Sequence, residues 1–304
     1  MVVNYERTSL CSNSLPETTP SLFQSPIFRR LSFSMKILLM NYILGGQTGS
    51  ETWTATMADE LEIQGHEVDM RTDASKLPDV YDLAIINHNT CLTTAQHLTC
   101  KKIFTSHGVL PDLEQPVAGA DVYVAVSEEV QQNLKDKGFE STIIRNGIDY
   151  EHFHPYKPVN RTLKNVLFSS NYQSNAESII RDACNRVGAN FTRIGGQQRT
   201  TQVLHELNKA DLVIGLGRTS YEAMSCARNV IVYDYNGGDG FVTPHTVFKF
   251  RTHNCSGRYN RHQYTADDLV ELFKRYDPDI GRRLRNYIYQ NNNVEKTAKQ
   301  YLNL

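Results

Sequence analysis

Short apolar runs alternate with helical patterns along most of this chain. The first run, at 36–42, precedes a glycine-rich turn and a predicted helix at 50–64. Further runs are rich in branched or aromatic residues, which is typical of strands. They lie at 66–71, 82–87, 101–106 and 121–126. Ser127 is a suitable N-cap for a helix at 128–137. This alternation predicts a parallel sheet covered by helices.

The pattern is interrupted at 154–160, where two prolines and polar residues can continue neither a helix nor a central strand. Alternation then restarts. Strands are expected at 165–169, 190–194, 211–216 and 229–235, and helices at 174–187, 199–209, 220–227 and 267–276. A last helix is expected at roughly 279–302, long enough to lie across both halves. Two consecutive units imply a crevice between them, and ligands bind such sheets at the carboxyl ends of the strands.

The fold class predicted is therefore α/β, with two Rossmann-like, doubly wound lobes that face each other across a cleft. The N-terminal lobe is expected at 35–155 and the C-terminal lobe at 160–280, with a C-terminal helix at 281–304 that packs back across the lobes. Residues 1–34 are rich in Ser, Thr and Pro and have no sustained periodicity. They predict a disordered tail or an over-long gene start.

The composition of the 304-residue chain is that of an ordinary globular protein. Its 32 basic and 33 acidic residues leave a formal net charge of −1, so no global field favours a nucleic acid or an anionic membrane as the main ligand. Six cysteines form no C-x-x-C pair, and reduced thiols in the cytoplasm are the simplest interpretation. No apolar run approaches the ~20 residues of a spanning helix. We therefore expect a cytoplasmic protein without a transmembrane segment.

Two candidate ligand groups follow strands of the N-terminal half. Gly45 and Gly46 precede a helix whose N-terminus favours an anion, although the spacing is not the G-x-G-x-x-G of NAD sites, and a plain turn with Ser50 as N-cap is the alternative. His107, with Gly108 beside it, directly follows the run at 101–106. Its imidazole suits hydrogen bonding to a sugar hydroxyl or proton transfer. One of ten histidines in a loop could equally be simply solvated.

Two further candidates lie in the C-terminal half. A helix N-terminus and Arg218 would hold a diphosphate, and Glu222 could accept both hydroxyls of a ribose. Thr219 and Glu222 also have the spacing of a capping box, and both interpretations can be partly true. Gly238 and Asp239 lie in a glycine-rich segment that could present a carboxylate or amides to a sugar ring, or form an ordinary turn.

Together these segments resemble the retaining nucleotide-sugar glycosyltransferases of the GT-B fold, in the group often called family four. The resemblance runs from about 35 to 255. It rests on Gly45-Gly46 with Glu51, Gly65-His-Glu-Val68, Ser106-His-Gly108, Val124-Ala-Val-Ser-Glu-Glu129, Ile144-Arg-Asn-Gly-Ile-Asp149 with Phe153 and Pro155, Tyr221-Glu-Ala-Met-Ser225, and Val230-Ile-Val232.

The resemblance implies an acceptor-side N-terminal lobe and a C-terminal lobe that binds the nucleotide-sugar donor. Gly45 and Gly46 would approach the donor phosphates or sugar, Glu222 would hold the ribose, and His107 would contact the donor sugar. The leaving diphosphate would help to deprotonate the acceptor, so neither a cofactor nor a metal is expected. The acceptor stays open among a glycan, a lipid-linked sugar, a small molecule and a modified nucleic acid.

Two departures from the family pattern favour other interpretations. The family has an acid eight positions before the glutamate that corresponds to Glu222, where this chain has Ile214. The cations expected after the first strand of the C-terminal lobe are absent from 168–174, so Arg193 or Arg218 would have to supply that charge. A catalytically inert nucleotide-sugar-binding protein and a nucleotide-sugar epimerase are the alternatives.

Overall fold

The computed structural model describes residues 34–45 and 49–304. The tail predicted at 1–34 lies outside these residues except for Ser34, and so does Gly46. Within the described ranges, the helices are too short or too polar to cross a lipid bilayer.

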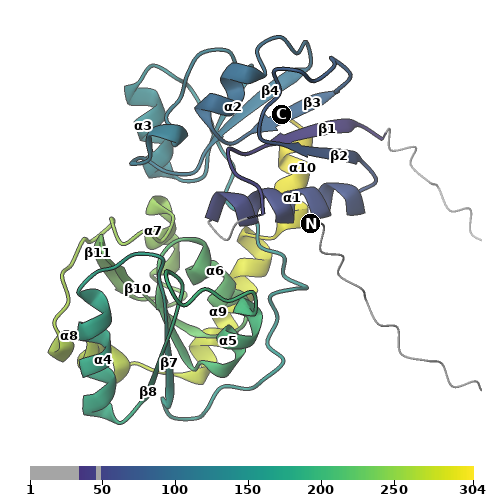
Figure 1. The fold of residues 1–304 in the computed structure, drawn as a ribbon. Helices are drawn as coiled ribbons and strands as arrows, with labels where there is room; N and C mark the ends of the chain where they lie inside the picture. Colours follow the sequence, from purple (N-terminus) through teal and green to yellow (C-terminus); the bar gives the residue numbers. More distant parts are fainter. Residues whose placement is uncertain (1–33, 46–48) are drawn as a thin grey trace, which may run out of the picture. The chain divides into compact units, whose positions relative to one another are not determined.

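The first half of the described chain forms a parallel sheet in the order β2-β1-β3-β4-β5-β6 (Figure 1). The strands are β1 (Lys36–Met40), β2 (Glu67–Arg71), β3 (Leu83–Ile86), β4 (Lys101–Ser106), β5 (Val122–Ala125) and β6 (Thr142–Ile143). Alternate side chains of β1 enter two cores: Ile37 packs with helix α1 (Gly49–Ile63), and Leu38 packs with helix α2 (Asn89–Thr94). Helices on both faces explain why the central strand β3 is apolar throughout.

Helix α3 (Glu128–Asp136) follows β5 and begins as the sequence predicts. The Ser127 side chain accepts a hydrogen bond from the backbone N–H of Val130 at 3.3 Å. This bond satisfies one of the amides that a helix start leaves without a partner.

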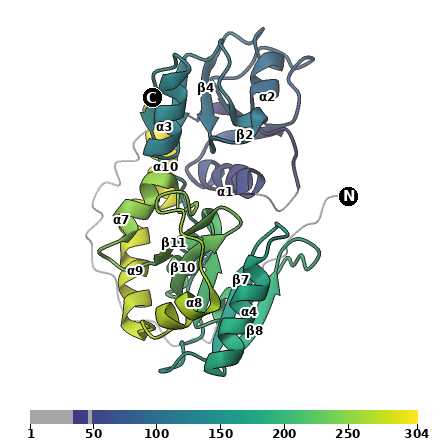
Figure 2. The ribbon, with the colours of Figure 1, turned by 90° about the vertical axis from the view of Figure 1, so that its left-hand side faces the viewer.

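The second half forms a sheet in the order β11-β10-β9-β7-β8, parallel except for β11. Its strands are β7 (Asn165–Ser169), β8 (Asn190–Ile194), β9 (Leu212–Gly215), β10 (Asn229–Asp234) and β11 (Gly237–Phe241). Its helices are α4 (Ala176–Val187), α5 (Val203–Lys209), α6 (Arg218–Ser225), α7 (Val247–Phe250) and α8 (Ala266–Phe273). One face is covered by α5 and α6, and the other by α4 and α8, which lie side by side in both views (Figures 1 and 2).

The glycine-rich segment around Gly238 and Asp239, expected as a ligand-presenting loop or an ordinary turn, is mostly strand, which corrects that prediction. Gly237–Phe241 pairs antiparallel with β10 as β11. The glycines make this close packing possible, because a Cβ atom on Gly238 would lie 2.5 Å from the Tyr264 ring and 2.7 Å from the carbonyl oxygen of Val232.

The last predicted helix is in fact two helices, α9 (Pro278–Asn291) and α10 (Val294–Leu302). Helix α9 packs against α6, and α10 packs against α1, as Figure 1 shows in yellow. The break occurs where the chain pairs with Ile148: the N–H of Ile148 donates to the carbonyl of Asn292 at 2.7 Å, and the N–H of Val294 donates back to Ile148 at 3.1 Å. These tertiary hydrogen bonds compete with the helical ones, so the helix ends there.

Candidate active site

His107 and Arg218 follow strands at or next to the switch points of the two sheets. In the first sheet the chain changes direction between β1 and β3, and in the second between β7 and β9. Ligands of doubly wound sheets bind at such points. His107 directly follows β4, next to β3, and Arg218 begins α6 three residues after the end of β9. Topology alone therefore places both side chains at ligand-binding edges.

The His107 imidazole is held by a hydrogen-bonded network. Its Nε2 lies 3.2 Å from Oδ1 of Asn87, whose amide donates to Thr54 Oγ1 at 2.8 Å. The Asn41 amide donates to the same hydroxyl at 2.9 Å. Because Oδ1 of Asn87 can only accept, His107 carries its proton on Nε2. The Trp53 ring packs edge-on against the imidazole, with centroids 5.0 Å apart.

This environment keeps His107 uncharged. Burial, together with repulsion of a positive charge by nearby His88 and Arg218, lowers the pKa of His107 to about 3. A neutral imidazole cannot act as a cationic acid near pH 7. Of the two roles expected for His107, hydrogen bonding is therefore the one that its surroundings favour.

A buried carboxylate that sequence reasoning missed supports the His107 turn. Glu114 ends a short 3₁₀ helix at Asp112–Glu114 and is 8% exposed. Its carboxylate accepts hydrogen bonds from the backbone N–H groups of His107 and Gly108. Burial raises the pKa of Glu114 to about 7, although these two hydrogen bonds oppose the rise.

Arg218 and Glu222 form a buried ion pair on the first turns of α6. Arg218 Nε lies 2.7 Å from Oε1 of Glu222, and the two side chains are 9% and 8% exposed. The other guanidinium nitrogens donate to Thr56 Oγ1 on α1 at 2.9 Å and to the Gly147 carbonyl at 3.4 Å. Burial raises the pKa of Glu222, and the Arg218 charge opposes the rise. Arg218 thus links α6 to α1 and to the segment that follows β6.

The capping box expected from Thr219 and Glu222 does not form. Gly217, with φ of 55°, is the N-cap of α6, so Thr219 lies inside the first turn. Its hydroxyl lies 3.4 Å from that of Ser169 at the end of β7. A capping box needs the threonine at the N-cap, so it cannot form here. The Glu222 carboxylate pairs with Arg218.

Arg193 has partners of its own. Its guanidinium binds the Glu177 carboxylate on α4 and the Tyr172 carbonyl, the latter at 2.8 Å. Among the described residues it makes no hydrogen bond or ion pair with Arg218 or His107. The diphosphate role considered for Arg193 therefore requires it to exchange partners.

Asp239 and Gly238 are buried in β11, and Asp239 is 3% exposed. The Asp239 carboxylate accepts the backbone N–H of Asn260 at 2.9 Å, which anchors the loop at 257–260. Burial raises the pKa of Asp239. The open sugar loop expected here is thus a strand that fastens a neighbouring segment. Gly45, in contrast, is exposed, has φ of +83° and has open space where a Cβ atom would be.

The signal that singled out His107 also applies to residues that were missed. Asn87 and His88 directly follow β3, and Asn41 directly follows β1. Their positions after apolar runs would have been enough to select them. Thr56 and Glu114 gave no such signal, because neither follows a strand.

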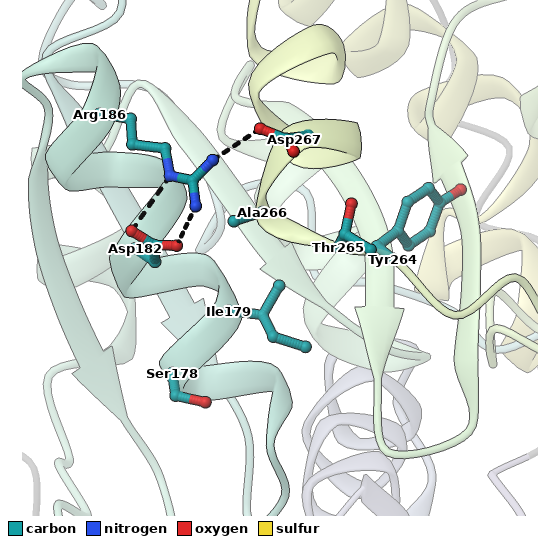
Figure 3. A pocket seen from close by; sticks show the side chains of 8 residues that line it. All are labelled: Ser178, Ile179, Asp182, Arg186, Tyr264, Thr265, Ala266 and Asp267. Carbon is teal, nitrogen blue, oxygen red and sulfur yellow. Dashed lines mark hydrogen bonds and ion pairs between the residues drawn. The ribbon is translucent and has the colours of Figure 1, made fainter.

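A separate pocket of about 400 Å³ lies between α4 and α8 (Figure 3). Arg186 bridges its two walls, binding Asp182 and Asp267 at 2.6 Å each. None of the predicted site residues lines this pocket. Within the described ranges, no group of three or more His, Cys, Asp or Glu side chains has the arrangement of a metal site.

No family model and no curated protein matches the sequence. Solved structures do match the fold. AviGT4, a glycosyltransferase involved in avilamycin A biosynthesis, superposes with a TM-score of 0.60 at 13% identity over 88% of this chain and 96% of that one. An α-glucosyltransferase in complex with UDP and a 13-mer DNA containing an HMU base superposes with a TM-score of 0.56 at 13% identity, over 89% of this chain and 99% of that one. SnogD from Streptomyces nogalater, also a glycosyltransferase, superposes with a TM-score of 0.52 at 13% identity, over 88% of this chain and 99% of that one. The predicted two-lobed α/β class is confirmed, and the chain has the GT-B fold.

Proposed function

We propose that this protein is a glycosyltransferase that moves a sugar from a nucleoside-diphosphate sugar to an acceptor hydroxyl with retention of configuration. The observation that carries the proposal is the buried Arg218–Glu222 pair at the start of α6, which contacts Thr56 of the other lobe beside His107. Residues predicted independently from both halves of the sequence thus meet at one place. A solved structure of the same fold that holds UDP supports a nucleotide donor.

Each side chain then has a defined role. The N-terminal amides of α6 and the Arg218 guanidinium hold the diphosphate, which replaces Thr56 and Gly147 as partner of the arginine. Glu222 accepts the ribose hydroxyls, and neutral His107 forms a hydrogen bond with the donor sugar. Fixed positive charge at the leaving diphosphate stabilises the transition state. The departing diphosphate takes the proton of the acceptor hydroxyl on the same face of the sugar.

A catalytically inert nucleotide-sugar-binding protein is the second candidate. Ile214 is fully buried in β9, where the resembling family has an acid. The segment at 168–174 supplies no cation. An epimerase would need carboxylates beside the sugar to move protons, and no observation favours it.

A thermal-shift screen with UDP, GDP, TDP and ADP sugars tests the proposal. A ligand at about 100 times its Kd stabilises the fold by about 2.7 kcal/mol, which raises Tm measurably. Hydrolysis of the donor that binds would support the transferase, and binding without hydrolysis or transfer would favour the inert protein. If none of the four binds to folded protein, both interpretations are refuted.

His107→Ala tests the catalytic role at the site. We expect turnover to fall about 100-fold with little change in nucleotide affinity, because the imidazole faces the sugar and not the nucleotide. His97→Ala is the matched control, since His97 is an exposed histidine that hydrogen-bonds to carbonyls near α2. Unchanged turnover in His107→Ala would remove His107 from the mechanism.

A further inference from the structure

We propose that Glu114 is the positioning residue of the active site: its carboxylate fixes the backbone of the His107–Gly108 turn and thereby the imidazole. The catalytic part of this inference rests on the proposed transferase function. Its structural part does not, and the two parts are tested by different measurements.

The geometry of the turn carries the inference. β4 ends at Ser106, and the chain leaves the sheet at His107. There two successive backbone N–H groups point at one carboxylate, that of Glu114. The turn is closely packed, because a Cβ atom on Gly108 would lie 3.4 Å from Pro111 and 3.9 Å from Oε2 of Glu114. Without this acceptor, two amides at the edge of the sheet would lose their partner.

The choice of a carboxylic acid at this position is costly. Glu114 is almost fully buried and forms no ion pair in the described part of the chain. A buried carboxylate without a cation opposes folding, and what it offers in return is two acceptor oxygens for the two N–H groups, where a glutamine side chain offers one. Costly groups of this kind cluster at functional sites. Because Glu114 binds the backbone of His107, we attribute this cost in folding free energy to the positioning of the imidazole.

Contacts of the ring and of its backbone define where the imidazole lies, and the Asn146 side chain also forms a hydrogen bond with the ring. Asn87 binds Nε2, Trp53 packs against the ring, and Glu114 holds the backbone from which the side chain projects. Asn87 and Trp53 contact the ring only, so the backbone of the turn depends on Glu114 and on the Ser106 hydroxyl, which donates to the Gly108 carbonyl at 3.2 Å. A displacement of about 1 Å at a catalytic group can cost about 100-fold in rate, so the backbone contact matters to turnover.

Hydrogen exchange tests the structural part without any substrate. We compare the His107 and Gly108 amides by NMR in the wild type, Glu114→Ala, Glu114→Gln and Asp69→Asn. Asp69 is the matched control, an N-lobe carboxylate that accepts from Tyr81 on the β2 side of the sheet. We expect exchange at least about 10-fold faster in Glu114→Ala, near wild type in Glu114→Gln, whose carbonyl still accepts, and unchanged in Asp69→Asn. Unchanged exchange in Glu114→Ala would overturn the inference. If that variant does not fold, an unshifted His107 amide resonance in Glu114→Gln would do the same.

Donor turnover tests the catalytic part. Glu114→Ala should lower kcat about 10-fold with KM unchanged, and Glu114→Gln should restore most of it. The double variant with His107→Ala should be no slower than His107→Ala alone, because Glu114 acts through His107. Additive losses would show that Glu114 acts elsewhere. If no donor is turned over, the transferase proposal fails while the exchange data still decide the structural part.

Discussion

The buried carboxyl of Glu114 predicts a pH-dependent stability that Glu114→Gln should remove. Burial raises its pKa from the ordinary 4.5 to about 7. A raised pKa means that the folded state holds the proton more tightly than the unfolded state does. The stability from this proton is therefore fully present below pH 4.5 and is lost as the pH rises through 7.

The two pKa values set the size of the effect. Each pH unit between them is worth about 1.4 kcal/mol, so the ionised carboxyl costs the folded state about 3 kcal/mol above pH 7. Between pH 5 and pH 8 the change is about 2.5 kcal/mol. His107, the titratable side chain beside Glu114, stays neutral in the folded state over this range, because burial lowers its pKa to about 3. Protonation of His107 on unfolding affects both variants equally and cancels in their difference.

Urea unfolding of the wild type and of Glu114→Gln at pH 5, 6, 7 and 8 measures this difference. Glutamine keeps the shape and one acceptor of the side chain but does not titrate. The stability of Glu114→Gln relative to wild type should rise by about 2.5 kcal/mol from pH 5 to pH 8, mostly between pH 5 and pH 7. Parallel pH curves for the two proteins would refute the reasoning, since they would mean that Glu114 has an ordinary pKa in the folded state.

Two further predictions concern stability. Arg228 is 1% exposed, donates to three oxygens and has no carboxylate partner in the part of the chain that the structure describes. Arg228→Met should therefore lower the free energy of urea unfolding by about 3 kcal/mol, and a loss below about 1 kcal/mol would contradict this. Gly147→Ala should lower the free energy of unfolding by about 3 kcal/mol in the same assay, because its Cβ would lie 2.6 Å from Cα of Val294. Gly49→Ala on α1 is the control and should be neutral or stabilising, because a Cβ atom there meets open space. Equal effects of the two substitutions would show that space at Gly147 is not limiting.

Much of the fold could be predicted because its central strands, such as β3 and β9, are buried on both faces. Such strands read as continuous apolar runs, and caps such as Ser127 mark the helices between them. The two errors have a common cause. At 237–241 the local composition is that of a turn, and at 291–293 three asparagines interrupt a helical pattern; at both places pairing with distant segments decides the structure. A single sequence does not reveal such partners.

The same limit applies to the site. His107 and Arg218 could be selected because they follow strands, and the carboxyl ends of parallel strands are ligand-binding edges. Thr56, which binds Arg218 across 162 positions of sequence, could not. The interpretation of Asp239 as a sugar ligand has a related weakness. An acid among glycines looks accessible in sequence, yet here the glycines let the strand pack closely and bury it.

The junction between the lobes gives a physical reason for the most recognisable motif of the chain. At Asn146-Gly147-Ile148, the Asn146 carbonyl accepts from the Asn292 side chain at 3.0 Å, and Ile148 pairs with the break between α9 and α10. Gly147 must lack a side chain because the backbone of α10 lies where its Cβ would be. The Gly147 carbonyl, on its other side, accepts from Arg218. The segment that joins the lobes therefore also orients the arginine proposed to hold the diphosphate, so any motion at this junction must change the donor site.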